Sequence, residues 1–286
     1  MHKPYGIFKY DVNALSTYIA YQTNTSLPQV KQKSQIKYID NYLANFTDNP
    51  IYVVYESEYI DQHYLNDYTA YYVTCFNNYK KHCSRIHLFM FDTPMQNDDT
   101  HVLELEKALG AKSSQINNKN YLGYIVLRPI PQTFLAKVCL KPYNNDYRVF
   151  SSLKNYNVSL FGIALEVKTI AAQEQDRILS ACATTSLWSF FHSHPNKRHT
   201  ELPSSSAITK SAYPQHNGYE REFPNSGLST DMICRVLRVN NLAPENYQFH
   251  QDKDAQKNTD LFKEMLYSYI SSGLPLILSV SVSDNG

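Results

Sequence analysis

Residues 172–191 read AQEQDRILSACATTSLWSFF, and the change of character within this stretch sets the organisation of the second half of the chain. A polar lead-in gives way to a single cysteine, Cys182, and then to an apolar run that ends in two phenylalanines. Because the apolar residues fall on several faces of a helix, the run is typical of a helix buried in a core. The pattern predicts a central helix over 180–192, with Cys182 in its first turn.

The thiol of Cys182 has two explanations. Cysteine is small and commonly buried, so it can simply fill space. Alternatively, the unpaired N–H groups and the dipole of a helix N-terminus stabilise an anion by roughly 0.3–1 kcal/mol, which favours a thiolate. Ser180 is the expected N-cap of this helix. Upstream, Gln173 or Gln175 could supply an amide donor beside the thiol, as an oxyanion hole requires.

Composition excludes several classes of protein. The chain has 286 residues, a formal net charge of +1 and no long basic run, so nothing indicates binding to nucleic acid or to an anionic membrane. The N-terminus lacks the apolar core of a signal peptide. The longest apolar stretch, 274–282, is far below the ~20 residues needed to span a bilayer. Five scattered cysteines make no disulfide framework and indicate a reducing cytoplasm.

The first 165 residues mix strands and helices, which predicts an N-terminal α+β domain over 1–165. The predicted strands cover 49–60, 84–91, 120–131 and 134–143, with one or two more in 158–170, and the predicted helices cover 61–83 and 100–110. Many of the 24 tyrosines lie in this half. Tyrosine is both a good strand and core residue and a residue that contacts partners, so this half is also a candidate surface for a protein partner.

The remaining residues, 166–286, predict a second α+β domain rich in helices. Beyond the central helix, we expect helices over 204–213, 227–242 and 258–273, the last stopped by Gly273. A near-continuous apolar run predicts a strand over 274–283. The sequence then reads Asp-Asn-Gly, and an Asn-Gly pair after a strand favours a hairpin turn. We therefore expect a partner strand to follow.

The order of these motifs resembles the papain-like cysteine peptidases, especially the bacterial branch that includes the bacteriocin-leader peptidases. QEQDRILSACATTSLWSFF is similar to the nucleophile segment of that family, and GLSTDMICRVLRVNNL and YISSGLPLILSVSV are similar to its helix pair and its G-x-P strand. The resemblance covers about 170–286. It implies a papain-like α+β half that cleaves an amide bond of a peptide or protein substrate, or transfers its acyl group, without a cofactor. Cys182 would be the nucleophile and Gln175 the oxyanion donor. The first half resembles bacterial proteins with the same C-terminal half and no assigned activity.

The catalytic histidine of that family has no counterpart here. In the family it opens the hairpin partner of the G-x-P strand, whereas the last histidine of this sequence, His250, precedes the last predicted helix. His192 and His194 follow the cysteine by ten and twelve residues, about 15–18 Å along a helix, which is too far for a hydrogen bond. We therefore expect the peptidase-like domain to be cut before its histidine strand and inactive. The alternative is a non-catalytic interaction module that keeps the fold and binds a protein partner through its tyrosine-rich half.

A set of cysteines and histidines imitates a metal site. Cys75, His82, Cys83 and His87 lie close in sequence, but their spacing fits no common zinc finger, and they straddle a predicted helix and strand. We predict no metal there, with the histidines solvated or capping. Cys83, at the boundary of two elements, is expected to be the main rival of Cys182 in reactivity, because Cys75 and Cys234 fall in predicted amphipathic helices.

Two further charged positions allow more than one interpretation. Glu56 and Glu58 lie on one face of a predicted strand, as paired carboxylates or, more simply, as part of a solvated face. Arg128 lies between apolar neighbours in VLRPIP. It is expected to be a buried guanidinium, either in a structural ion pair, which is the favoured interpretation, or as a binding group for an anion.

Overall fold

The computed structural model divides the chain into two compact units. The first is Met1–Asp146 with Lys154–Asp176, and the second is Tyr147–Leu153 with Arg177–Gly286. The division lies at residue 176 rather than at the predicted 165, because the strand over 163–169 pairs with the strand over 154–160. The described residues are 5–46, 49–91, 118–143, 149–176, 181–194, 202–213, 227–249 and 255–280, with the single positions 107 and 179. The fold is α+β, as predicted.

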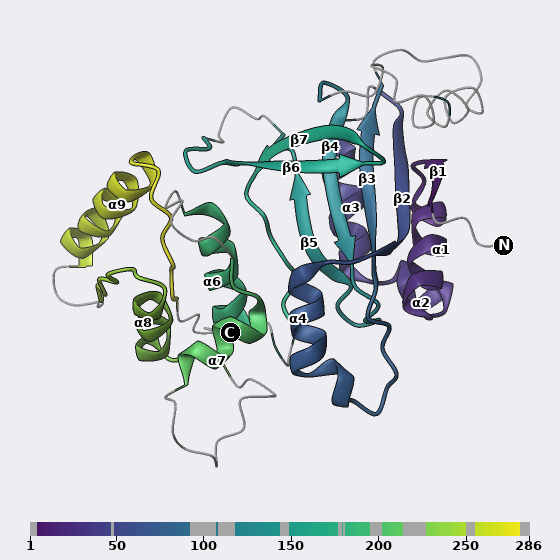
Figure 1. Cartoon of the computed structure of the whole chain (residues 1–286). Coiled ribbons are helices and arrows are strands. Elements are labelled where there is room, and N and C mark those ends of the chain that lie inside the picture. The colour runs from purple at the N-terminus through teal and green to yellow at the C-terminus, as the bar shows by residue number, and fades with distance from the viewer. Residues whose placement is uncertain are drawn as a thin grey trace. The chain divides into compact units, whose positions relative to one another are not determined.

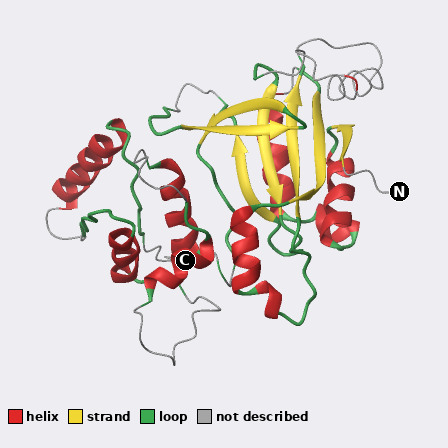
Figure 2. Ribbon diagram, viewed as in Figure 1, coloured by secondary structure: helices red, strands yellow, loops and turns green. Residues whose placement is uncertain are grey.

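A five-stranded antiparallel sheet forms the centre of the first unit, with its strands in chain order (Figure 1, Figure 2). The strands are β1 (Tyr5–Lys9), β2 (Ile51–Tyr59), β3 (Cys83–Met90), β4 (Tyr121–Leu127) and β5 (Leu135–Leu140). The last four confirm the strands predicted between 49 and 143. In β4, Gly123 has φ +126, and a Cβ there would lie 2.1 Å from the carbonyl oxygen of Cys139, so only glycine fits.

Three helices cover one face of this sheet. They are α1 (Val12–Thr23), α2 (Leu27–Lys31) and α3 (Ser34–Leu43), followed by a 3-10 turn over Ala44–Phe46. Asp11 caps α1 by accepting hydrogen bonds from the backbone N–H groups of Asn13 and Ala14. Apolar side chains of α1 and α3 pack on alternate residues of β2 and β3, and this contact is the main core of the unit.

A β-hairpin covers the opposite face. It consists of β6 (Lys154–Leu160) and β7 (Ile163–Thr169), so the apolar run over 158–170 is part of two strands. Phe161 and Gly162 join them with φ values of 49° and 86°, the signs that a tight two-residue hairpin turn requires. β7 contacts β4 and β5, and Figure 1 shows the hairpin crossing the sheet. Because both faces are covered, even the polar side chains of β3 are buried.

The helix predicted over 61–83 is much shorter than expected. Asp61 caps α4 (Gln62–Ala70), but Tyr71 leaves the helical conformation and a 3-10 turn follows over Tyr72–Thr74. The prediction is wrong beyond residue 70, because the turn directs the Tyr72 ring into the interior, where its hydroxyl donates a hydrogen bond of 3.1 Å to Asp176. The helix predicted over 100–110 lies outside the described residues.

Helices are the regular elements in the described part of the second unit. α6 (Cys182–Ser193) contacts α7 (Ser205–Ala212), and α7 contacts α8 (Thr230–Val239). These confirm the helices predicted from 180 to 242, with Ser204 and Ser229 as caps of the last two. None of the helices in the described ranges is long and apolar enough to cross a membrane.

The last helix is α9 (Ala255–Ser271), and Gly273 stops it, as predicted. Gly273 has φ +75, and its N–H donates to Ile270 while that of Leu274 donates to Tyr269, which is the pattern of a Schellman cap. The predicted strand over 274–283 is not formed over 274–280, and its last residues lie outside the described ones. A strand needs a partner for its backbone groups, and no described segment pairs with this one.

Candidate functional site

The candidate site is the N-terminus of α6, where the helix begins at Cys182. Ala181 is the N-cap, with extended backbone angles of φ −61 and ψ 166. The predicted cap, Ser180, is therefore wrong by one residue. Alanine has no side-chain acceptor, so α6 begins without a side-chain cap. The thiol thus lies at the first helical position, where the backbone N–H groups and the dipole favour an anion.

The thiol and the body of its helix lie in different environments. Cys182 is exposed, whereas Leu187, Trp188 and Phe191 on the same helix are almost completely buried. The helix is therefore held in the core of its unit by its later turns. Since the thiol itself is outside that core, it does not serve to fill space.

A neighbouring helix fixes the first turn of α6. The buried hydroxyls of Thr184 and of Thr209 on α7 lie 3.4 Å apart, and that of Thr209 donates to the carbonyl oxygen of Leu179, also at 3.4 Å. Either hydroxyl can be the donor of the contact between the two threonines. The small side chains of this turn let α7 approach, and the position of the thiol is defined by buried contacts.

The two histidines of this region lie at the far end of α6. His192 is buried, and its ring centre lies 3.9 Å from that of Trp188, while the ring of His194 lies 5.3 Å from Phe190. Ten residues of helix separate His192 from Cys182, about 15 Å along the axis. Neither imidazole is placed to take a proton from the thiol, as expected from the sequence.

Gln175, the predicted oxyanion donor, is exposed. The residues on either side of it, Glu174 and Asp176, are bound to other parts of the first unit. The backbone N–H of Glu174 donates to the carbonyl oxygen of Leu135 at 2.9 Å, and the backbone N–H of Leu135 donates to the Glu174 carboxylate at 3.1 Å. Asp176 is buried and ion-paired with Arg128 at 3.5 Å. Gln175 belongs to the first unit and Cys182 to the second, so neither unit by itself brings the two predicted site residues together.

Arg128 is the centre of this anchor. Its side chain is 3% exposed. Besides the pair with Asp176, it donates through Nε to the carbonyl oxygen of Thr133 and through Nη2 to that of Glu174, at 3.4 Å. Burial raises the pKa of the Glu174 carboxyl, which also accepts from the Gln35 amide. The guanidinium is therefore in a structural ion pair, the favoured of its two interpretations.

A second polar network lies under the hairpin and was not predicted. The Glu56 carboxylate accepts from Nε of Arg85 at 2.5 Å and from Nε2 of His87 at 3.0 Å, so the interpretation of Glu56 as solvated is wrong. Because the carboxylate can only accept, the hydrogen of the neutral His87 ring is on Nε2. The other ring nitrogen, Nδ1, then accepts from the hydroxyl of Tyr121, at 2.9 Å. Strand pairing places Glu56 opposite Arg85, which no local pattern reveals. Glu58 is exposed.

Burial has opposite consequences for the two titrating groups of this network. Burial disfavours the charged ring and lowers the pKa of His87. It would raise the pKa of Glu56, but hydrogen bonds from His87 and Arg85 outweigh it and the pKa lies below its ordinary value. The network is therefore an ion pair of Glu56 with Arg85, to which His87 contributes as a neutral donor.

The cysteines and histidines that imitate a metal site are not brought together as ligands. Both ring nitrogens of His87 are engaged by Glu56 and Tyr121, so its expected solvation is wrong. Cys83 is buried, and Cys75 is half-buried at the end of a 3-10 turn. Among the residues whose positions are described, no group of three histidine, cysteine or acidic side chains could hold a metal ion.

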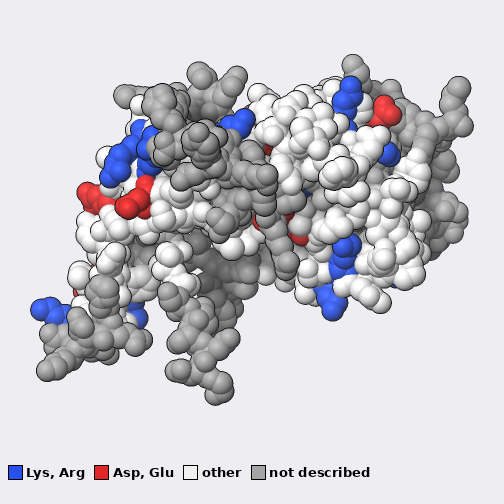
Figure 3. Space-filling model, turned by 90° about the horizontal axis from the view of Figure 1, so that it is seen from below, with Lys and Arg blue, Asp and Glu red and all other residues white. Residues whose placement is uncertain are grey.

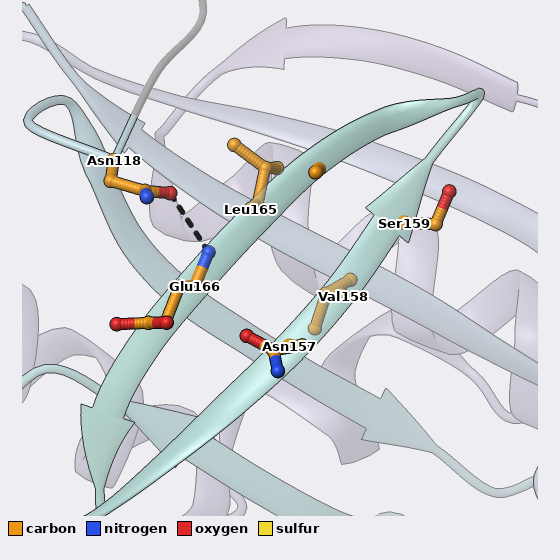
Figure 4. A pocket seen from close by; sticks show the side chains of 7 residues that line it. Asn118, Asn157, Val158, Ser159, Leu165 and Glu166 are labelled. Atoms are coloured by element: carbon orange, nitrogen blue, oxygen red, sulfur yellow. Dashed lines mark hydrogen bonds between the residues drawn. The ribbon is translucent and has the colours of Figure 1, made fainter.

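An open hollow of about 490 Å³ lies over the β6–β7 hairpin (Figure 4). Asn118 closes one side, and its side-chain oxygen accepts a hydrogen bond of 2.8 Å from the backbone N–H of Glu166. The lining residues include no thiol, imidazole or cation. On the face drawn in Figure 3, the described charges are few and scattered, with no broad area of one sign.

Comparison with protein-family models, with curated proteins and with solved structures gives no match to this chain.

Proposed function

We propose that the chain carries the nucleophile of a papain-like thiol hydrolase or acyltransferase, with Cys182 as that nucleophile and Gln175 as oxyanion donor, and that it is acylated on Cys182 without completing the hydrolysis of an amide. The observation that carries the proposal is an exposed thiol at the first residue of a helix whose body is buried. A helix N-terminus favours the thiolate, and the buried contacts of the first turn hold it in place. The substrate would be an amide bond of a peptide or protein, attacked without a cofactor in the reducing cytoplasm.

The chemistry divides into an acylation and a release. The thiolate attacks the substrate carbonyl, the leaving group departs, and the acyl group stays on sulfur as a thioester. Amide cleavage needs a general acid for the departing amine and a base for the incoming water, and neither His192 nor His194 is placed to act. We therefore expect this chain to form a thioester with activated esters and to hydrolyse peptides negligibly.

A second candidate is a non-catalytic interaction module, and the positions of His192 and His194 favour it. Exposed tyrosines of the first unit, Tyr5, Tyr21 and Tyr38, would contact a protein partner. Of the other fifteen tyrosines of that unit, eight are half-buried and seven are buried in its core: Tyr18, Tyr42, Tyr52, Tyr64, Tyr72, Tyr121 and Tyr124. The high tyrosine content is therefore mainly structural, which weakens this candidate.

An acylation experiment separates the two candidates. With p-nitrophenyl acetate in excess, a nucleophilic Cys182 releases about one equivalent of nitrophenolate rapidly and then turns over slowly, because nothing speeds the loss of the acetyl group. Cys182→Ala should remove this burst, and Cys234→Ala, which deletes a half-buried thiol inside α8, should keep it. If the wild type shows no burst, or if Cys182→Ala shows the same burst, the catalytic proposal is wrong and the interaction module is the remaining candidate.

A further inference from the structure

The helix-covered core of the first unit ends at serines on two neighbouring strands. Alternate side chains of β2 up to Tyr55, and of β3 down to Ile86, pack with α1 and α3 in this core. Because side chains alternate between the two faces of a strand, the next residues in these rows are Ser57 and Ser84. The hydroxyl oxygens of both serines are shielded from solvent. Two polar groups therefore lie at the end of an apolar core.

Two polar side chains of α1 meet these serines. Tyr18 and Gln22 are four residues apart, so they lie on one face of the helix. Tyr18 is only 9% exposed, and its ring centre lies 4.4 Å from that of Tyr55, which fixes the direction of its hydroxyl. Burial raises the pKa of Tyr18. Polar groups of Ser84, Ser57 and Gln22 lie beside its hydroxyl and oppose this effect.

Within the described ranges of the chain, these four groups have no hydrogen-bond partner. The atoms are the hydroxyl oxygens of Tyr18, Ser57 and Ser84 and the amide nitrogen of Gln22, and all four are shielded from solvent. They lie near one another, yet no two of them meet with the distance and angles of a hydrogen bond. Buried polar groups are almost always hydrogen-bonded, either to protein or to internal water. The arrangement therefore fits a small molecule that bridges the four groups.

We propose that this point is a binding site for one internal water molecule, which bridges α1 to β2 and β3. A buried water makes up to four hydrogen bonds. It would accept one from the Gln22 amide nitrogen, which can only donate, and one from a hydroxyl. It would donate to the two remaining hydroxyls, since a hydroxyl both donates and accepts. A single molecule then satisfies all four groups.

The surroundings select water over an ion or a larger molecule. The side chains that act on the Tyr18 hydroxyl are all uncharged at neutral pH, and a buried ion without a counter-charge is strongly disfavoured. The close packing of a protein core leaves few spaces larger than a water molecule. The site belongs to the first unit, so it does not depend on the function of Cys182.

A high-resolution crystal structure of the full chain tests the site directly. We expect electron density for one water within about 3 Å of at least three of the four atoms. Tyr18→Phe leaves three partners and should retain the water. Tyr18→Phe/Ser57→Ala/Ser84→Ala leaves only the Gln22 amide and should lose it. Direct hydrogen bonds among the four side chains, density for an ion or a larger molecule, or no density at all would each overturn the proposal.

Oxygen-17 relaxation dispersion, which counts the water molecules held inside a protein, gives a second test in solution. The wild type should hold one more long-lived water than the triple variant. The matched control is Tyr42→Phe, which removes a buried hydroxyl of the same core that donates directly to the carbonyl oxygen of Lys141 at 2.8 Å. It should leave the count unchanged. Equal counts in the wild type and a folded triple variant contradict the site, and if that variant does not fold, the wild-type crystal structure decides.

Discussion

At the scale of single residues, exposure separates Cys182 from the thiols of the first unit. Burial raises the pKa of Cys83 above its ordinary value and that of Cys139 to about 11. Both are therefore almost entirely protonated at neutral pH and slow to alkylate. Cys83 was expected to be the main rival of Cys182 in reactivity. That expectation is wrong, because Cys83, the first residue of β3, is buried.

Limiting iodoacetamide on the native protein should therefore label Cys182 first. The matched control is Cys234, a half-buried thiol in the middle of α8, which has no helix N-terminus beside it. Peptide mapping by mass spectrometry at several times gives the order of labelling, and we expect Cys83 and Cys139 last. If Cys234 reacts well ahead of Cys182, the N-terminus of α6 gives the thiol no advantage, and the catalytic proposal should be abandoned.

At the scale of elements, the missing cap of α6 offers a direct test of the local field. Ala181→Ser supplies an acceptor for the first-turn N–H groups and should stabilise the protein by roughly 1 kcal/mol. Ala181→Asp supplies the same acceptor with a negative charge beside Cys182, which disfavours a thiolate. Alkylation of Cys182 should slow more in the aspartate variant than in the serine variant. Equal rates in the two would mean that charge at this position does not act on the thiol.

The elements also show what local sequence can predict. The apolar alternation of β2 and the apolar run of α6 come from neighbouring residues, and both elements lie close to where the patterns predict them. Glu56 was misinterpreted because its partners, Arg85 and His87, are about 30 residues away and meet it only through strand pairing. The strand over 274–283 failed for the same reason: its sequence favours a strand, but a strand also needs a partner.

At the scale of the whole molecule, acid should destabilise the fold in two stages. The pKa of His87 lies below its ordinary 6.5, so the unfolded chain binds this proton more readily, and stability present above about 6.5 is lost as the pH falls. Burial lowers the pKa of His63 to about 4, so His63 also makes the fold less stable as the pH falls. The pKa of Glu56 lies below 4.5, so its contribution is lost only at lower pH.

Urea unfolding followed by circular dichroism should therefore give a lower midpoint at pH 5 than at pH 7.5. His87→Gln keeps an N–H donor for Glu56 without a titrating ring. The midpoint of this variant should therefore fall less between pH 7.5 and pH 5 than that of the wild type, and the remaining fall should come from His63. A wild-type midpoint that is constant over this range would mean that neither His87 nor His63 has a lower pKa in the folded protein than in the unfolded chain.

The path of the chain between the units bears on how the protein can be divided. The chain leaves the first unit after Asp146, returns at Lys154 and leaves again after Asp176. Ser151 lies in the excursion, and its carbonyl oxygen is 3.7 Å from where a Cβ of Gly273 would stand. A gene fragment that encodes 1–176 therefore carries every residue of the first unit. A fragment that begins at 177 lacks seven residues of the second, so that unit cannot be transplanted as one uninterrupted cassette.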